Sequence, residues 1–493
     1  VHALCVWPGR LGSWMTCHGC CACVGIGCCF LRWTSGDSAR SLGSLRRLLL
    51  RDLCVSRKLS CINNRLLSDF FFPNVGGVER HMYMIGQHLI RRGHKVRTTT
   101  LTQVIVITHA YSPDRVGIRY LSAGIKVYYV PYGVLVRQDT LPNFFGLMPV
   151  LRSILIRERI QIVHAHQALS SMAHEGLFHA KCLGLKAVFT DHSLFGFADV
   201  GSILTNKLLR FALTDVDHVV CVSHTGRENT VLRAALHPEN VSTIPNAVDA
   251  HQLYPDPAPC RDGGICVVVL SRLMYRKGID LLLEAIPPLC EQHPDVRFVI
   301  GGDGPKYVEL EQMRERHMLQ DRVELVGAVR QRDIRAHLTR GQLFLNTSLT
   351  EAFGTTIIEA TCAGLYVVTT KVGGIPELLP PSMMRLAEPC AEAIVDAMSH
   401  AIEYIRSGKH DAMAQHQRVA SMYSWAETTQ RLETVYARAM AAPQRSATER
   451  FQRYLAVGGP VGGPIICLVV AAQMILALIL EWVIPDASIP RVP

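Results

Sequence analysis

Two alternating patterns of hydrophobic residues begin at about Leu66. Short apolar runs with the length and β-branched content of buried strands alternate with longer segments whose apolar residues recur at helical spacing. Met82, Ile85 and Leu89 are one example of the helical pattern. The predicted strands are VIVITHAY (104–111), KVYYVP (126–131), QIVHAHQ (161–167), KAVFTDHS (186–193), HVVCVS (218–223), ICVVVLSRL (265–273), RFVIGGDGP (297–305), VELVGAV (323–329), QLFLNTS (342–348) and YVVTTKVGG (366–374). This alternation predicts an α/β fold with parallel sheets and crossover helices.

Proline and turn residues become frequent over 244–259, which predicts a linker between two domains. We expect a first Rossmann-like domain over 66–247 and a second over 248–440. The segment 441–493 then begins with a polar, basic linker.

An apolar stretch of about 20 residues, from about 465 to 484, is long enough to cross a bilayer. A buried amphipathic helix is the alternative. Arg445, Arg450 and Arg453 precede the stretch, so the positive-inside tendency predicts a single span with the large domains in the cytoplasm. We found no credible signal peptide, so the sequence predicts a tail-anchored protein.

The composition narrows the classes of ligand. Hydrophobic residues make up 49% of the chain, charged residues 19%, and the formal net charge is +10. The basic residues are dispersed and are not interleaved with aromatic residues, which argues against a nucleic-acid partner and is compatible with phosphorylated ligands or an anionic membrane surface.

Cysteine usage sets the N-terminal segment apart. Nine of the 17 cysteines lie within residues 1–61, and Cys17, Cys20 and Cys23 have ligand-like spacing. A matching downstream Cys/His pair is missing, so we predict no metal site. Residues 1–65 are interpreted as a disordered segment or an artefact of the gene model. The other eight cysteines are scattered, as in a reducing compartment.

The stretch NTSLTEAFGTTIIEATCAG (346–364) holds the main candidate chemistry. Phe353, Gly354 and Thr355 form a flexible turn at the start of a predicted helix, where free backbone N–H groups can bind an anion. Glu351 and Glu359 flank this turn and would lie roughly 12 Å apart at 1.5 Å per residue. Carboxylates that share one bond-breaking event lie roughly 5–9.5 Å apart, so these two suit opposite ends of an extended ligand. They could also be solvated charges.

Other candidates follow predicted strands. Arg272 and Lys277 suit a diphosphate, or belong to a solvated loop. Gly76 and Gly77 permit close approach of a phosphate, or only a tight turn.

Four histidines end predicted strands. Because the carboxyl ends of parallel strands face the ligand crevice, His109, His164, His166 and His192 are candidates to line one cleft. His192 is the strongest of them, since the preceding Asp191 could orient its ring.

Four of these motifs together resemble the retaining GT-B glycosyltransferases of family 4: GGVE (76–79), SRL…RKG (271–278), GGDGP (301–305) and EAFG…E (351–359). Longer stretches, among them SDFFFPNVGGVERH and LNTSLTEAFG, look like the members that transfer N-acetylglucosamine to phosphatidylinositol. The resemblance covers roughly residues 66–440. It implies a GT-B fold, with two Rossmann-like domains facing a cleft, and it fits a C-terminal transmembrane helix.

The resemblance also implies residue roles. Arg272 and Lys277 would neutralise the UDP diphosphate in place of a metal, and no cofactor is expected. Glu359 would bind the ribose and Glu351 the donor sugar, while His192 would contact the transferring sugar. The implied phosphate contacts are Phe353, Gly354 and Thr355, with Gly76 and Gly77 letting the first domain close on the diphosphate.

The implied partners are UDP-N-acetylglucosamine, phosphatidylinositol and other subunits of a membrane complex that makes glycosylphosphatidylinositol (GPI) anchors, at the endoplasmic reticulum membrane. Two alternatives stay open: another lipid glycosyltransferase of family 4, or a non-catalytic nucleotide-binding subunit. The sequence RTTTLTQ (97–103) interrupts the resemblance and could be a loop extension or a retained intron.

Overall fold

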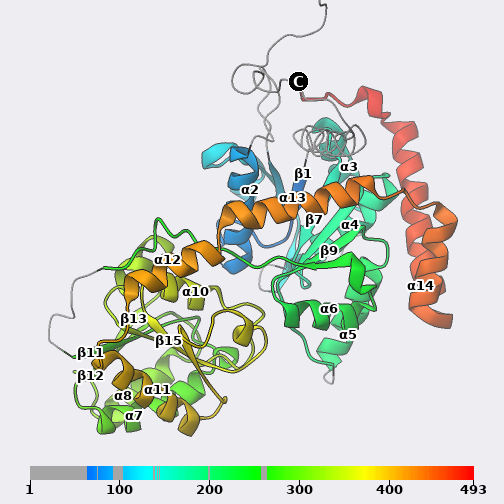
Figure 1. The fold of residues 1–493 in the computed structure, drawn as a ribbon. Coiled ribbons are helices and arrows are strands. Elements are labelled where there is room, and N and C mark those ends of the chain that lie inside the picture. Colours follow the sequence, from blue (N-terminus) through cyan, green and yellow to red (C-terminus); the bar gives the residue numbers. More distant parts are fainter. Residues whose placement is uncertain are drawn as a thin grey trace, which may run out of the picture. The chain divides into compact units, whose positions relative to one another are not determined.

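The computed structural model describes residues 64–492 except 75, 93–103, 137–138, 141–142, 144, 198–199 and 257–263. The cysteine-rich segment and RTTTLTQ therefore lie outside the described residues, and the interpretations given to them stay predictions. The described residues belong to one structural unit that contains two large sheets, each with helices packed against it, and a small two-stranded sheet (Figure 1).

The first sheet has eight strands in the order β10-β9-β8-β7-β1-β2-β4-β3. All neighbours pair in parallel except β3 and β4, which are antiparallel. Its strands are β1 (Asn64–Leu67), β2 (Ile105–His109), β3 (Gly117–Tyr120), β4 (Lys126–Val130), β7 (Ile162–His166), β8 (Lys186–Asp191), β9 (His218–Cys221) and β10 (Val241–Thr243). Its helices are α2 (Gly77–Arg91), α3 (Leu147–Arg157), α4 (Ser171–Cys182), α5 (Val200–Leu213) and α6 (His224–Ala234).

The second sheet has six parallel strands in the order β13-β12-β11-β14-β15-β16. They are β11 (Ile265–Leu270), β12 (Val296–Gly301), β13 (Val323–Gly327), β14 (Leu343–Asn346), β15 (Tyr366–Thr370) and β16 (Met384–Ala387). The helices of this part are α7 (Ile279–Gln292), α8 (Tyr307–Arg316), α9 (Ile334–Leu338), α10 (Thr355–Cys362), α11 (Ala391–Arg406) and α12 (Ala412–Met422).

Each of the ten predicted apolar runs contains a strand, and the predicted α/β fold with parallel sheets is confirmed. Strand β11 shows why the runs lack polar positions. Ile265, Val267 and Val269 pack into one apolar core while Cys266 and Val268 pack into another, because successive side chains point to opposite faces and both faces are covered. The ten runs do not include β1, β3, β10, β16 or the two-stranded ladder of β5 (Val134–Val136) and β6 (Asp139–Thr140), which have only two to four residues each.

Helix α13 (Trp425–Ala441) corrects the predicted extent of the second domain, 248–440. Its buried residues Trp425, Leu432 and Tyr436 pack into the core of the first sheet together with residues of α2. The helix carries an apolar stripe at helical spacing, and that stripe is buried against the first sheet. We therefore call residues 64–247 with α13 the first lobe, and residues 248–424 the second lobe.

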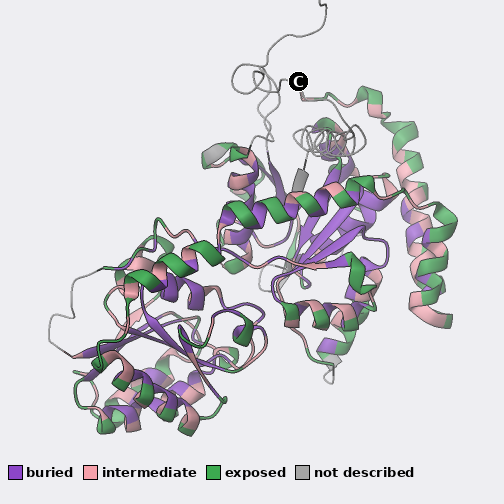
Figure 2. Ribbon diagram, in the orientation of Figure 1, coloured by how far each residue is buried: buried purple, intermediate pink, exposed green. Residues whose placement is uncertain are grey.

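Helix α14 (Ala447–Val483) contains the predicted membrane span and is long and apolar enough to cross a membrane by length and composition. Gly459 has non-helical backbone angles and divides it into two segments. The segments run side by side, since Sγ of Cys467 lies 3.6 Å from the carbonyl oxygen of Phe451. The second segment buries Val470 and Gln473 against the first lobe, whereas most of its residues are exposed or half-buried (Figure 2).

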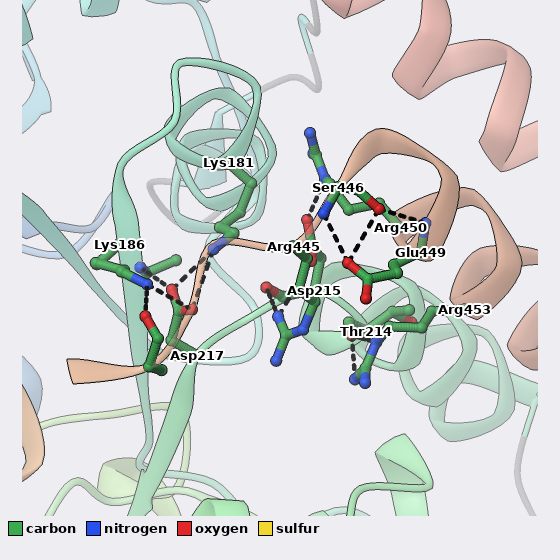
Figure 3. A network of polar contacts seen from close by, with 12 residues as sticks. Lys181, Lys186, Thr214, Asp215, Asp217, Arg445, Ser446, Glu449, Arg450 and Arg453 are labelled. Atoms are coloured by element: carbon green, nitrogen blue, oxygen red, sulfur yellow. Dashed lines mark hydrogen bonds and ion pairs between the residues drawn. The ribbon is translucent and has the colours of Figure 1, made fainter. Parts of the chain in front are cut away.

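The arginines before the span bind the first lobe (Figure 3). Arg450 and Arg445 both contact the carboxylate of Asp215, which is 1% exposed, the latter at 3.1 Å. Arg453 donates to the carbonyl oxygen of Thr214 at 2.7 Å. A buried carboxylate requires such partners. Because Thr214 follows α5 directly, these contacts fix the start of α14 to the end of α5.

Candidate active site

The turn before α10 forms one wall of the candidate site. Gly354 is the N-cap of α10 and has φ 77° and ψ 57°, a left-handed conformation that glycine adopts without strain. The residues after it, Thr355 and Thr356, line the cavity described next. The backbone N–H groups of a first helical turn have no partner within the helix. The predicted turn at a helix start is therefore confirmed.

A cavity of about 350 Å³ is lined by residues of both lobes. It brings together eight of the ten predicted site residues: Gly77, His192, Arg272, Lys277, Glu351, Phe353, Gly354 and Thr355. Gly76 and Glu359 are not among its lining residues. The sequence reasoning missed the lining residues Gln167, Asn246 and Ser271. Gln167 and Ser271 lie near the ends of predicted strands, so a wider search of strand ends would have included them, whereas Asn246 lies in the predicted linker.

Lys277 and Glu351 form an ion pair at the edge of this cavity, and each side chain is about one fifth exposed. Lys277 ends a short 3-10 turn, after which Gly278 has φ 65° and caps α7. A Cβ at Gly278 would lie 1.8 Å from the carbonyl oxygen of Thr347. The glycine therefore permits the close approach that places Lys277 beside the loop of Glu351.

Glu359 is buried on α10 outside the cavity lining, and it forms an ion pair with Arg80 of α2 in the other lobe. Burial raises the pKa of the Glu359 carboxyl, while the Arg80 cation opposes that shift. The sequence reasoning missed Arg80, although a cation in the first turn after the GG motif was the available signal. A second contact between the lobes is made by Glu377, which accepts hydrogen bonds from the backbone N–H groups of His224 (2.6 Å) and Thr225 (2.7 Å).

The four candidate histidines do not share one cleft. His109 and His164 are fully buried outside the cavity lining, and the His164 ring is hydrogen-bonded to Tyr436 and Thr190. His166 is also buried, and its Nδ1 lies 3.3 Å from Nε2 of His192. His192 is the member of this group that lines the cavity.

The predicted partner of His192 was wrong. Asp191 instead accepts hydrogen bonds from the backbone N–H of Ser193 at 3.0 Å and from Arg233 at 3.2 Å. The buried guanidinium of Arg233 holds this carboxylate, and His166 is the residue that contacts the ring of His192. Burial holds the pKa values of His166 and His192 well below the usual histidine range, so both rings are neutral near pH 7.

The ring nitrogens of His81, His166 and His192 lie within 4.8 Å of one another. Neutral imidazoles are metal ligands, so this is a group of described residues whose spacing admits an ion. Two of its nitrogens already contact each other. The expectation of a metal-free site stays a prediction.

Comparison with known proteins decides the family. The profile described as PIGA (GPI anchor biosynthesis) matches residues 109–199, and that of glycosyl transferases group 1 matches residues 255–415. A human phosphatidylinositol N-acetylglucosaminyltransferase subunit is 48% identical over 93% of both chains. The chain belongs to the PIGA family of phosphatidylinositol N-acetylglucosaminyltransferase subunits. The gpi3 subunit from Schizosaccharomyces pombe is 50% identical over 86% of this chain and 91% of its own length.

Members of the PIGA family are glycosyltransferases, and the solved structures agree on the fold. The crystal structure of Anabaena Alr3699/HepE in complex with UDP matches with a TM-score of 0.61 and 18% identity, over 76% of this chain and all of that one. This PIGA family member is therefore a GT-B glycosyltransferase that has an apolar C-terminal helix compatible with one membrane span.

Proposed function

We propose that this chain transfers N-acetylglucosamine from UDP-N-acetylglucosamine to phosphatidylinositol, the first step of GPI-anchor synthesis, with retention of the anomeric configuration. One observation carries the proposal. The cavity joins the cations Arg272 and Lys277 to the start of α10 and to Glu351, in a chain 48% identical to the human relative.

The donor's charge suits this set of residues. A nucleotide diphosphate is stabilised by two cations and by free N–H groups at a helix start. Glu359 has one oxygen bonded to Arg80. Glu359 does not line the cavity in this structure, so we propose that its carboxylate, which has about four lone-pair sites, turns toward the ribose hydroxyls when the donor binds. We assign Glu351 and His192, which line the cavity from opposite lobes, to binding of the sugar.

The transfer step follows from this placement. The bond between the sugar C1 and the diphosphate oxygen breaks, and a bond from C1 to an inositol oxygen forms on the same face. The electron pair of the broken bond stays on the diphosphate oxygen, which also accepts the proton of the inositol hydroxyl, while a lone pair of the inositol oxygen forms the new bond. Arg272 and Lys277 stabilise that developing negative charge, so the step needs no metal.

The name of the human relative supports a proposal about partners. The human relative is named as one subunit of its enzyme, so we propose that this chain also works in a membrane complex. We also propose that the lobes lie on the cytoplasmic face of the endoplasmic reticulum membrane, with α14 as the membrane-spanning helix, because Arg445, Arg450 and Arg453 precede its apolar segment.

Two variants of the full complex test the assignment of roles. Glu351→Gln should retain UDP binding and lose transfer at least 100-fold, whereas Glu359→Gln should weaken UDP binding itself. A chain that only binds nucleotide would show unchanged lipid product with Glu351→Gln, and the catalytic proposal would be rejected.

Donor and acceptor need a separate assay. Membranes receive radiolabelled UDP-N-acetylglucosamine or GDP-mannose, and the labelled lipid is identified. Incorporation from GDP-mannose alone would refute the proposed donor. Restored surface GPI anchoring, in cells that lack the transferase, is the expected cellular result.

A further inference from the structure

Helix α5 carries apolar residues on both sides. Leu209, Ala212 and Leu213 are buried against the first lobe. On the outer side Ile203, Leu204 and Leu208 are exposed, and Leu204 is 70% exposed. A helix on the surface of a soluble lobe normally presents polar residues outward. The outer side of α5 therefore lacks the composition that water favours.

The charges of α5 fit an anionic interface. The helix contains no acidic residue, and the exposed Lys207 lies among its outer apolar residues. Interfacial helices combine a buried apolar row with lysine or arginine, whose long side chains reach lipid headgroups.

The outer row of α5 is continuous with α14. Phe211, near the end of α5, packs against Gly458 and Gly462 at the kink of α14. Just beyond the kink, Val461 and Ile465 are exposed. The Asp215 contacts described above hold the two helices together (Figure 3). The beginning of the apolar segment of α14 therefore lies next to the end of α5, where Val470 packs with Ala212.

The first residue of α5 follows two cavity-lining residues closely in the sequence. Leu194 and Phe195 line the cavity, and Phe197 is 54% exposed. Helix α5 begins at Val200, only five residues after Phe195. Exposed apolar side chains thus follow the cavity wall directly in sequence.

We propose that the outer row of α5 (Ile203, Leu204 and Leu208, with Phe197) is a membrane-docking surface that holds the first lobe on the bilayer. This inference rests on the proposed function, because it supplies the route of the lipid acceptor. The inositol headgroup enters the cavity past Phe195, and the acyl chains stay in the leaflet in which α5 lies. A bilayer is favoured over a protein partner because the row continues into an apolar helix that is long enough to span a membrane.

Photo-crosslinking identifies what covers the row. A photoreactive amino acid is placed at Leu204 of the full chain in its complex, in membranes that contain radiolabelled phospholipid. Leu232 on α6 is the matched control, since it is 69% exposed on the same lobe but outside the row. We expect lipid adducts at position 204 and at least tenfold fewer at position 232. Protein adducts at 204, or equal labelling of the two positions, would overturn the proposal.

Transfer kinetics supply the second test. Leu204→Asp with Leu208→Asp should lower transfer to phosphatidylinositol in vesicles at least tenfold, but change transfer to a water-soluble short-chain phosphatidylinositol less than twofold. Leu232→Asp should change neither. An equal loss on both acceptors would show a folding defect and reject the docking role. If the unmodified complex transfers to neither acceptor, the proposed function fails instead.

Discussion

The ion pair between Arg80 and Glu359 gives the sharpest quantitative prediction, because it is largely buried and joins the two lobes. The Glu359 side chain is 5% exposed and that of Arg80 is 21% exposed. Removing one partner of a buried pair costs about 3–5 kcal/mol, since a charge stays buried without compensation. Arg80 is partly exposed, so we expect about 3 kcal/mol for Arg80→Gln.

The expected change in Tm follows from the size of the chain. An unfolding entropy of about 2.1 cal/mol/K per residue, over about 430 residues that unfold together, converts 3 kcal/mol into a decrease of about 3 °C. Thermal unfolding of the purified complex, with and without UDP, measures it. The double variant Arg80→Gln with Glu359→Gln should recover most of the loss, because both charges are then absent.

The pH dependence has a definite sign. Burial raises the pKa of Glu359, and Arg80 opposes that shift, so Arg80→Gln raises the pKa further. The folded variant then binds a proton more tightly than the unfolded chain. The contribution of this carboxyl to the stability of the variant is greatest at low pH and falls as the pH rises above about 4.5 and through the raised pKa. The Tm difference from the unmodified protein should therefore be larger at pH 8 than at pH 5.5. A Tm equal to that of the unmodified protein at both pH values would refute the reasoning.

Three further predictions concern other contacts. His166→Phe should reduce kcat for sugar transfer about tenfold and leave UDP affinity unchanged, because the ring of His192 loses its hydrogen-bond partner. A kcat equal to that of the unmodified protein would show that His166 only fills space. Gly278→Ala should lower the Tm by several degrees more than Gly408→Ala. Both glycines have a positive φ (65° and 67°), but an added Cβ would meet backbone atoms only at Gly278. Equal losses of Tm would show that the close approach of Thr347 to Gly278 does not matter for stability. Asp215→Asn should make the start of α14 more sensitive to limited proteolysis by weakening its contacts with the arginines, and an unchanged cleavage pattern would contradict that anchoring role.

The sequence by itself determined much of the fold. Uninterrupted apolar runs such as ICVVVLSRL require burial on both faces of a parallel sheet, and this local property is visible without coordinates. The turn at Gly354 was likewise predictable, because glycine directly before a helix start is typical of a tight turn with a positive φ. Strand β3 was not predictable in this way, because all four of its residues are exposed and it has no apolar run.

Only the tertiary structure decided which partner each group has. Asp191 precedes His192 in the chain, yet its carboxylate binds Arg233 from α6, while His166 reaches His192 from the neighbouring strand. Arg80 and Glu359 are 279 residues apart and meet across the two lobes. Helix α13 follows the second lobe in sequence and packs on the first. Periodicity fixes which side of an element is apolar, but the surface that covers that side is chosen by contacts distant in sequence, and no local pattern records them.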